Sequence, residues 1–170
     1  MTRTREPGGT PLGEEVRRLV LSGEPGGLSL AAEAHLFAAG RAELVERVVR
    51  PSLAAGRWVV SDRFLDSSLA YQGVARGLGI DCVLEINRAA VGDCLPHLSL
   101  IIDTPVGAAA WRRSAAPDRI ESEGAGFQGR VAAGYRQVAE RFPQRVRLVP
   151  GDGSVQEVHA RVMAAVGPFL

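Results

Sequence analysis

The sequence predicts an α/β fold in which a parallel β-sheet is flanked by helices. Short apolar runs alternate with longer stretches whose apolar residues recur at helical spacing, which is the pattern of parallel α/β architecture. Two of the apolar runs end directly at an aspartate, Asp62 and Asp103. Because open parallel sheets place ligands at the carboxyl ends of their strands, we expect the chemistry of the protein near these two positions.

Three apolar runs are predicted to be buried strands: Trp58–Ser61, Leu98–Ile102 and Val146–Val149. A further short segment, Thr2–Arg5, is compatible with the tail of another strand. The chain begins too abruptly before it for the pattern to decide.

Helices are predicted between these strands. Thr10-Pro11 and Thr104-Pro105 each combine a hydroxyl N-cap with proline at the first helical position. The stretch from Ser29 to about Leu53 has helical spacing, and Pro51 is expected to kink or break it. A capping box of Ser154 and Glu157 opens the last helix. Two buried helix faces are expected, one with Phe127, Val131, Tyr135, Val138 and Phe142 and one with Val155, Val158, Val162 and Val166.

Length and charge limit the classes of protein that fit. A chain of 170 residues is expected to form one domain, 1–170, with a sizeable core. A net charge of +1 argues against nucleic acid or a membrane surface as the main partner. The N-terminus has no apolar stretch typical of a signal peptide, so a cytoplasmic location is expected. The cysteines and histidines are scattered, so we expect no metal site made by side chains alone.

All 20 basic residues are arginine, and the sequence contains no lysine. This excludes lysine Schiff-base chemistry and any phosphate-binding loop of the form G-x-x-x-x-G-K-[ST] within the chain. Glycine and arginine cluster in three segments, at Arg5–Thr10, Asp62–Gly79 and Arg112–Glu123. Because the planar guanidinium pairs bidentately with phosphate oxygens, this clustering favours a phosphorylated ligand.

Five strings, in this order and at this spacing, make the chain similar to bacterial thymidylate kinases. They are Thr4-Arg5-Glu6-Pro7-Gly8-Gly9-Thr10-Pro11, Leu36-Phe37-Ala38-Ala39-Gly40-Arg41, Ser61-Asp62-Arg63-Phe64, Ser67-Ser68-Leu69-Ala70-Tyr71-Gln72-Gly73 and Asp118-Arg119-Ile120-Glu121-Ser122-Glu123. The similarity covers essentially all 170 residues. It implies a three-layer, P-loop NTPase-like fold and an enzyme that transfers the γ-phosphoryl group of ATP to dTMP, with Mg²⁺, to give dTDP.

The resemblance assigns the thymine base and the sugar to one group of residues. Phe37 would stack on thymine, and Arg41, four residues later on the same helical face, would donate to a thymine carbonyl. Ser68 and Gln72 are placed at the base edge, and Tyr71 against the sugar, where it can disfavour a 2′-hydroxyl.

A second group is assigned to the phosphate and the metal. Arg63 resembles the arginine that clamps the dTMP phosphate and holds it in line for attack. Glu6 resembles a carboxylate near that phosphate and Mg²⁺, although a structural or outer-sphere role fits nearly as well. Arg17 resembles a basic residue that lines the acceptor pocket. Asp62 either orders Arg63 or touches the water shell of the metal, and we favour the first reading.

The segment 112–123 resembles the LID that closes over ATP and supplies arginines to the transferring phosphoryl group. Arg112, Arg113 and Arg119 are the catalytic candidates, and the sequence does not rank them. Arg119 lies between Asp118 and Glu121 and could instead form an internal ion pair.

The chain departs from the family pattern at its start. In the family a strand, a P-loop and a helix precede the Thr-Arg-Glu-Pro string, which here begins at residue 4. In the family that strand is the centre of a sheet of order 2-3-1-4-5, so its loss would take away the partner between Trp58–Ser61 and Leu98–Ile102. Unpaired strand groups cost about 1–3 kcal/mol each when buried. The two strands are therefore expected to close up, to be repaired by another chain, or to fold poorly.

Two explanations of this departure stay open. In the first, which we favour because every acceptor-side motif is intact, Met1 is an internal or misassigned start and the P-loop lies upstream. In the second, the chain is a genuine short protein that binds dTMP, or nothing, without catalysis. Little or no turnover is expected from these 170 residues alone. A related nucleotide kinase is a more distant alternative, and a homodimer through helix faces is usual for the family.

Overall fold

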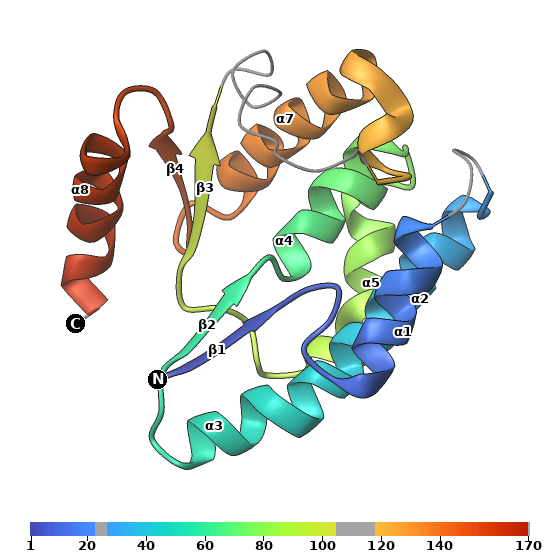
Figure 1. Cartoon of the computed structure of the whole chain (residues 1–170), viewed down its shortest axis with the longest axis horizontal. Coiled ribbons are helices and arrows are strands. Elements are labelled where there is room, and N and C mark those ends of the chain that lie inside the picture. The colour runs from blue at the N-terminus through green and yellow to red at the C-terminus, as the bar shows by residue number, and fades with distance from the viewer. Residues whose placement is uncertain (23–26, 105–117, 170) are drawn as a thin grey trace.

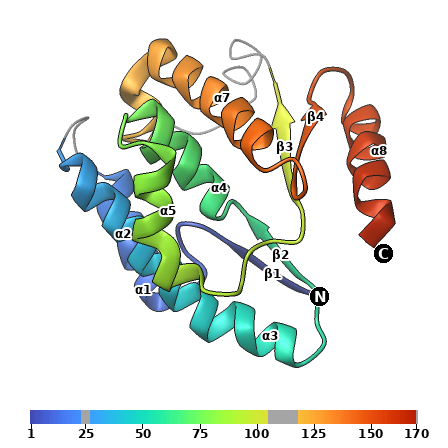
Figure 2. The same ribbon diagram turned by 180° about the vertical axis from the view of Figure 1, so that it is seen from behind.

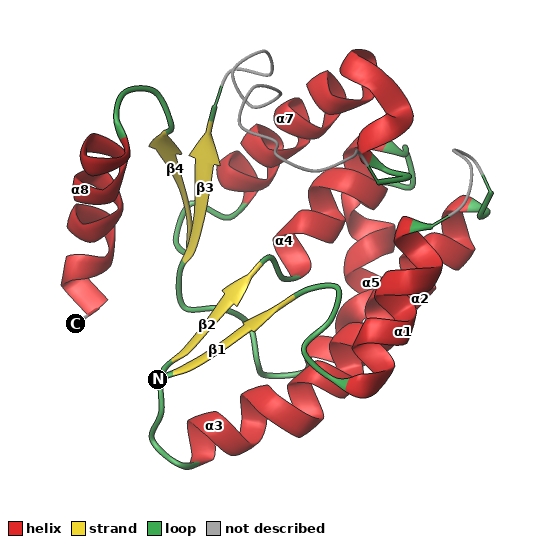
Figure 3. Cartoon of the chain, viewed as in Figure 1, coloured by secondary structure: helices red, strands yellow, loops and turns green. Residues whose placement is uncertain are grey.

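The computed structural model describes residues 1–22, 27–104 and 118–169. Its strands are β1 (Thr2–Arg5), β2 (Val59–Asp62), β3 (Ser99–Asp103) and β4 (Val146–Pro150). Its longer helices are α1 (Pro11–Leu21), α2 (Leu30–Leu44), α5 (Ile80–Val91), α7 (Gly124–Arg141) and α8 (Val155–Val166). Shorter helical segments are η1 (Val45–Val49), α3 (Arg50–Ala54), α4 (Leu65–Ser68), η2 (Leu69–Ala75), η3 (Glu121–Glu123) and η4 (Gly167–Phe169). The expected α/β class is confirmed (Figures 1 and 3).

The four strands form two parallel pairs. β1 pairs with β2, with Thr2 opposite Val59 and Arg5 opposite Asp62, so Thr2–Arg5 is a strand. β3 pairs with β4, with Ser99 opposite Val146. The three runs predicted to be strands are all strands, each within one residue of its expected start.

The two pairs are not hydrogen-bonded to each other, and the order of the strands is β1-β2 and β3-β4. Among the described residues, β2 and β3 therefore do not close up onto one another. Apolar side chains on both strands remain open to solvent: Val60 of β2 is 52% exposed and Ile102 of β3 is 41% exposed. Of the three outcomes expected from the sequence, direct pairing of β2 with β3 is therefore wrong for the described residues, in which each of these strands keeps only its outer neighbour.

Helix starts and breaks follow the sequence signals. The Thr10 hydroxyl accepts a hydrogen bond from the backbone of Gly13 at 3.0 Å, and Pro11 is the first residue of α1. The stretch from Leu30 to Ala54 stays helical through Pro51, with a π-helical turn, η1, directly before it. A wider turn accommodates a residue that has no N–H to donate and whose ring crowds the preceding turn. The helix start expected at Thr104-Pro105 lies outside the described residues.

Two apolar clusters hold the helices together, and the first of them also reaches β4. One contains Leu65, Leu69, Val83, Val91, Val138 and Val146. The other contains Ala75, Ile120, Phe127 and Val131. In the contact between α7 and η2, a Cβ added to Gly134 would lie 2.8 Å from the carbonyl oxygen of Ala70. This close approach sets α7 alongside α4 and η2 (Figure 2).

The last helix differs from its expectation. The capping box forms, since the Ser154 hydroxyl accepts from the Glu157 backbone and the Glu157 carboxylate accepts from the Ser154 backbone. However, α8 has no buried residue, and Val155 is 82% exposed. The helix lies at the outer side of β4 (Figure 1), so its apolar face is covered only in part. Among the described residues, no helix has the length and apolar character needed to cross a membrane.

Candidate functional site

A cavity of about 340 Å³ lies beyond the carboxyl ends of β1 and β2, between α1, α2, η2 and residues 118–121. Its volume lies in the range of sites that hold small molecules. All eight residues that the sequence assigned to substrate binding line this one cavity: Glu6, Arg17, Phe37, Arg41, Arg63, Ser68, Tyr71 and Gln72. Residues from four separate segments of the chain thus converge on one site.

Arg41 is the centre of a buried polar network on the α2 side of the cavity. Its side chain is 1% exposed, and its Nε donates to Glu6 Oε2 at 2.9 Å. Nη2 donates to Ser68 Oγ at 3.0 Å, and Nη1 donates to Asn87 Oδ1. Arg41 is therefore held by three neighbours before any ligand arrives, which fixes its position in the cavity wall.

Glu6 carries the opposite charge in this network. Burial raises the pKa of the Glu6 carboxyl, and the charge and hydrogen bonds of Arg41 oppose that rise only in part. Its second oxygen, Oε1, is buried without a hydrogen-bond partner among the described residues. Glu6 thus has one oxygen committed to Arg41 and one free at the cavity.

Asn87 takes part in this network although sequence reasoning missed it. It is 1% exposed on α5, and its Nδ2 donates to the Val83 carbonyl oxygen at 2.8 Å. The available signal was a polar residue on the apolar face of a helix, next to Val83 and Val91 in the helical pattern. That signal marks a buried amide without showing its partner.

Arg63 follows β2 and has a backbone φ of 69°, which is uncommon for a residue other than glycine. The Ser61 hydroxyl donates to the Arg63 carbonyl oxygen at 2.7 Å and supports this conformation. Arg63 Nη1 donates to Tyr135 Oη at 3.0 Å, and the Arg63 guanidinium lies 5.4 Å from the centre of the Tyr71 ring. The side chain is held on aromatic groups while it remains exposed at the cavity.

Tyr135 is a second residue that sequence reasoning placed only in a helix core. It comes from α7, and its hydroxyl lies 2.8 Å from Ser67 Oγ. Burial raises the pKa of Tyr135, so its hydroxyl stays protonated and keeps a proton to donate. Arg17 reaches the same cavity from α1, where its Nη1 donates to the Pro7 carbonyl oxygen at 3.1 Å. Phe37 and Tyr71 are half-buried at the cavity wall.

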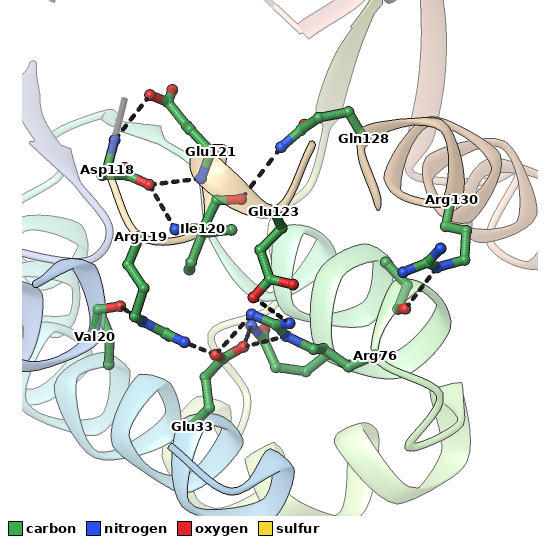
Figure 4. Close-up of polar contacts among 12 residues, drawn as sticks. Val20, Glu33, Arg76, Asp118, Arg119, Ile120, Glu121, Glu123, Gln128 and Arg130 are labelled. Atoms are coloured by element: carbon green, nitrogen blue, oxygen red, sulfur yellow. Dashed lines mark hydrogen bonds and ion pairs between the residues drawn. The ribbon is translucent and has the colours of Figure 1, made fainter. Parts of the chain in front are cut away.

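Of the three arginines expected to act from the LID, the structure describes only Arg119. Arg112 and Arg113 lie outside the described residues. Arg119 is 4% exposed, and its guanidinium is directed toward α1 and α2, where Nη2 donates to Glu33 Oε2 at 2.6 Å and Nε to the Val20 carbonyl oxygen at 2.8 Å (Figure 4). The internal ion pair that the sequence left open thus forms with Glu33. Asp118 instead accepts from the backbone N–H groups of Ile120 and Glu121.

Glu33 is the third residue that sequence reasoning missed. Burial alone would raise its pKa, but hydrogen bonds from Arg119, Gln72 and Arg76 bring the pKa below its ordinary value of 4.5. The carboxylate is therefore ionised at neutral pH. Nothing in the helical pattern of α2 separates this glutamate from the solvent-exposed glutamates of the chain.

A family model, curated relatives and a solved structure that match this chain are all described as thymidylate kinases. Residues 1–162 match the protein-family model described as thymidylate kinase. A thymidylate kinase of Rhizorhabdus wittichii is 44% identical over 174 residues, covering 100% of this chain and 84% of that protein. A thymidylate kinase of Synechococcus is 47% identical over 169 residues, covering 98% of this chain and 80% of that protein. The crystal structure of thymidylate kinase from Ehrlichia chaffeensis has a TM-score of 0.77 and 29% identity, covering 97% of this chain and 80% of that one.

Proposed function

This chain belongs to the thymidylate kinase family, and from that membership we propose that the cavity beside β1 and β2 is its dTMP site. The reaction of the family transfers the terminal phosphoryl group of ATP to dTMP and yields dTDP. The observation that supports this site is the convergence of eight residues on one cavity at the carboxyl ends of parallel strands. Ligands of open α/β sheets bind at that edge.

The base and the sugar would occupy the α2 and η2 side of the cavity. Phe37 would offer an aromatic face to thymine, and Gln72 of η2 and Ser68 of α4, which line the same cavity, would contact the base edge. Arg41 would donate to a thymine carbonyl from a position that Glu6, Ser68 and Asn87 already fix. Tyr71 would face the sugar. Such preorganisation lowers the entropic cost of holding the acceptor.

The phosphate would lie in the part of the cavity lined by Arg63 and Arg17, of which Arg63 is exposed. Tyr135 and Tyr71 hold Arg63 in place, so its guanidinium can pair bidentately with phosphate oxygens and orient the acceptor for in-line attack. During transfer, Arg63 and the LID arginines Arg112, Arg113 and Arg119 would neutralise the charge that develops. For Arg119 this role requires it to leave Glu33.

The carboxylates at the site fit a magnesium ion. Asp62 is exposed at the end of β2, and the Oε1 atom of Glu6 is buried without a partner, and both residues line the cavity. Mg²⁺ is commonly held by one or two carboxylates together with waters and substrate phosphates. Glu6 would hold it through its water shell, and when bound it would neutralise phosphate charge. Asp62 would either join Glu6 in this role or, as we favour from the sequence, order Arg63.

We further propose that the two strand pairs are the outer strands of one three-layer, P-loop NTPase-like sheet of five strands. The support is their order, β1-β2 and β3-β4, with unpaired edges at β2 and β3. The position between these edges would hold the strand and loop that cradle the phosphates of ATP. The 170 residues contain no lysine for such a loop, so they provide the acceptor site and LID of the kinase.

The absence of lysine from the 170 residues also supports one alternative function, a module that binds dTMP without turnover. ATP-dependent dTDP formation, measured for these 170 residues and for a version that adds any G-x-x-x-x-G-K-[ST] segment encoded in frame upstream, separates the two. Turnover near that of an intact relative from the 170 residues alone would refute the five-strand proposal. A cytoplasmic location, a single domain 1–170 and a homodimer through helix faces remain predictions.

Binding of dTMP tests the site itself. At a dTMP concentration 100-fold above Kd, binding stabilises a folded protein by about 2.7 kcal/mol, so we expect a clear rise in Tm with dTMP. Arg63→Ala should remove most of that rise, because the phosphate loses its bidentate partner. Arg57→Ala is the matched control, since Arg57 is an exposed arginine just before β2. No rise in the wild-type protein, or equal rises in all three, would contradict the proposed site.

A further inference from the structure

Glu33 joins Gln72 of the cavity wall to Arg119 near the end of the segment that resembles the LID. Its contacts with Arg119 and Arg76 are drawn in Figure 4. Glu33 is 1% exposed at the start of α2 and has contacts from three cationic or amide side chains. Arg119 Nη2 donates to its Oε2 at 2.6 Å, and Arg76 donates to both of its oxygens at 3.2 Å. Gln72 Nε2 donates to its Oε1 at 2.9 Å. Glu33 does not itself line the cavity.

The contact with Gln72 decides which way that amide faces. A carboxylate only accepts hydrogen bonds, so Gln72 must turn its nitrogen toward Glu33. Gln72 is 2% exposed and lines the cavity, so its carbonyl oxygen is the group left for a ligand. The ionised state of Glu33 thus sets the hydrogen-bonding character of the cavity wall at this position.

A carbonyl oxygen at the base edge distinguishes the pyrimidines. Thymine and uracil carry a hydrogen on N3 and can donate to it, whereas N3 of cytosine has a lone pair and repels it. A site that leaves a buried polar group unpaired rejects the wrong ligand strongly. The orientation of one amide therefore favours dTMP over dCMP.

The same carboxylate also anchors a second part of the cavity wall, at residues 120–121. Arg119 joins it to one end of residues 119–123, and Arg76 bridges it to Glu123 at the other end at 2.6 Å. Between these anchors Ile120 packs in the cluster with Phe127 and Val131 and lines the cavity. This part of the cavity wall is thus fixed by the same residue that orients Gln72.

We propose that Glu33 is the positioning residue for base selection: it holds Gln72 with its carbonyl oxygen toward the pyrimidine and anchors residues 119–123 beside it. The proposal rests on the proposed dTMP site. It adds to that site a specificity determinant that touches no ligand.

Glu33→Gln tests it while changing few atoms. The new amide gives its oxygen to Arg119 and Arg76 and its N–H groups to Gln72, so the Gln72 amide turns over and presents an N–H to the base. We expect the ratio of dCMP Kd to dTMP Kd, measured by calorimetry, to fall by about tenfold or more. The control is Glu43→Gln on the same helix, whose partner Arg47 is 72% exposed, and it should leave the ratio unchanged.

A mutant cycle separates positioning from general loss of structure. If Glu33 acts through Gln72, Glu33→Gln added to Gln72→Leu should leave the ratio at the value of Gln72→Leu alone, whereas independent effects would add. If Glu33→Gln does not fold, Glu33→Asp is the second variant. It keeps the charge but withdraws the carboxylate from Gln72, so it should also lower the ratio of dCMP Kd to dTMP Kd. An unchanged ratio in a folded Glu33 variant overturns this inference alone. Failure of the wild-type protein to bind dTMP overturns the proposed site as well.

Discussion

Two buried charges on α2, Glu33 and Arg41, are stabilised in opposite ways. They lie eight residues apart, about two helical turns, and each is 1% exposed. Glu33 is an anion surrounded by two guanidinium groups and an amide. Arg41 is a cation with one carboxylate, one hydroxyl and one amide. Accordingly the pKa of Glu33 is lowered, whereas the pKa of Glu6, the anion beside Arg41, is raised by burial.

The difference shows which buried network can adapt when it is damaged. Glu6 can become neutral by taking up a proton, because the pKa of a carboxyl can rise within the ordinary pH range. Arg76 and Arg119 cannot lose a proton in a protein. The network around Glu33 therefore needs the Glu33 carboxylate to stay ionised. In the network around Arg41, by contrast, Glu6 can become neutral if Arg41 is lost.

The largest effect is expected from Glu33→Ala. It leaves the guanidinium of Arg119 buried without its counter-charge, and breaking a buried pair in this way costs about 3–5 kcal/mol. For a chain of this size the Tm should fall by about 10 °C. Because the pKa of Glu33 is lowered, its contribution is present above 4.5 and is lost as the pH falls through its folded-state pKa. The measured loss should therefore shrink in acid.

Glu43→Ala provides the reference for this loss, since Glu43 and Arg47 form a solvent-exposed pair on the same helix. Exposed pairs contribute about 0–1 kcal/mol, so its Tm should stay close to that of the wild type. Equal losses in the two variants would mean that burial of the network around Glu33 has no energetic consequence.

Arg41→Met is expected to have an intermediate effect, whose pH dependence lies above 4.5, whereas that of Glu33→Ala lies below it. Methionine fills much of the volume, and Glu6 becomes neutral in place of its ion pair, so the loss at neutral pH should be about 2–3 kcal/mol. The pKa of Glu6 is already raised with Arg41 in place, and removing Arg41, whose charge and hydrogen bonds lower that pKa, raises it further. The variant should therefore lose stability faster than the wild type as the pH rises above 4.5. Denaturant unfolding at several pH values should show a loss that grows with pH. A loss that shrinks with pH would contradict the neutral state of Glu6.

The sequence allowed much of the fold to be predicted, because strands, caps and helix periodicity are local signals. The Thr10-Pro11 start and the Ser154–Glu157 box form as expected. The eight binding residues could be assigned through motifs, and they converge on one cavity. The partners of these residues could not be predicted. Glu33 meets Arg119 from 86 positions away, and no spacing rule encodes such a contact.

Burial was also hard to predict where it depends on neighbours in space. Val155 continues the apolar pattern of α8 and is nevertheless exposed, because this helix has few neighbours beyond β4. Asn87 and Tyr135 show the reverse, since polar groups at core positions of a helix pattern prove to hold Arg41 and Arg63. Periodicity gives the face of a helix, and only the assembled structure gives the residue that faces it.

The smallest effect is expected from Asn87→Ala, and it shows how far Arg41 depends on neutral partners. Asn87 accepts from Arg41 and donates to the Val83 carbonyl oxygen, so its removal leaves one guanidinium N–H unpaired. Leaving a buried donor unsatisfied costs about 1–3 kcal/mol, and we expect about 1 kcal/mol because Glu6 and Ser68 still hold Arg41. Arg88→Ala, the next residue on α5 and an exposed one, should be nearly neutral. In the Arg41→Met background the Asn87→Ala loss should largely vanish, because the donor is gone. If the two losses were additive, Asn87 would support α5 through Val83 alone, and the network around Arg41 would consist of Glu6 and Ser68.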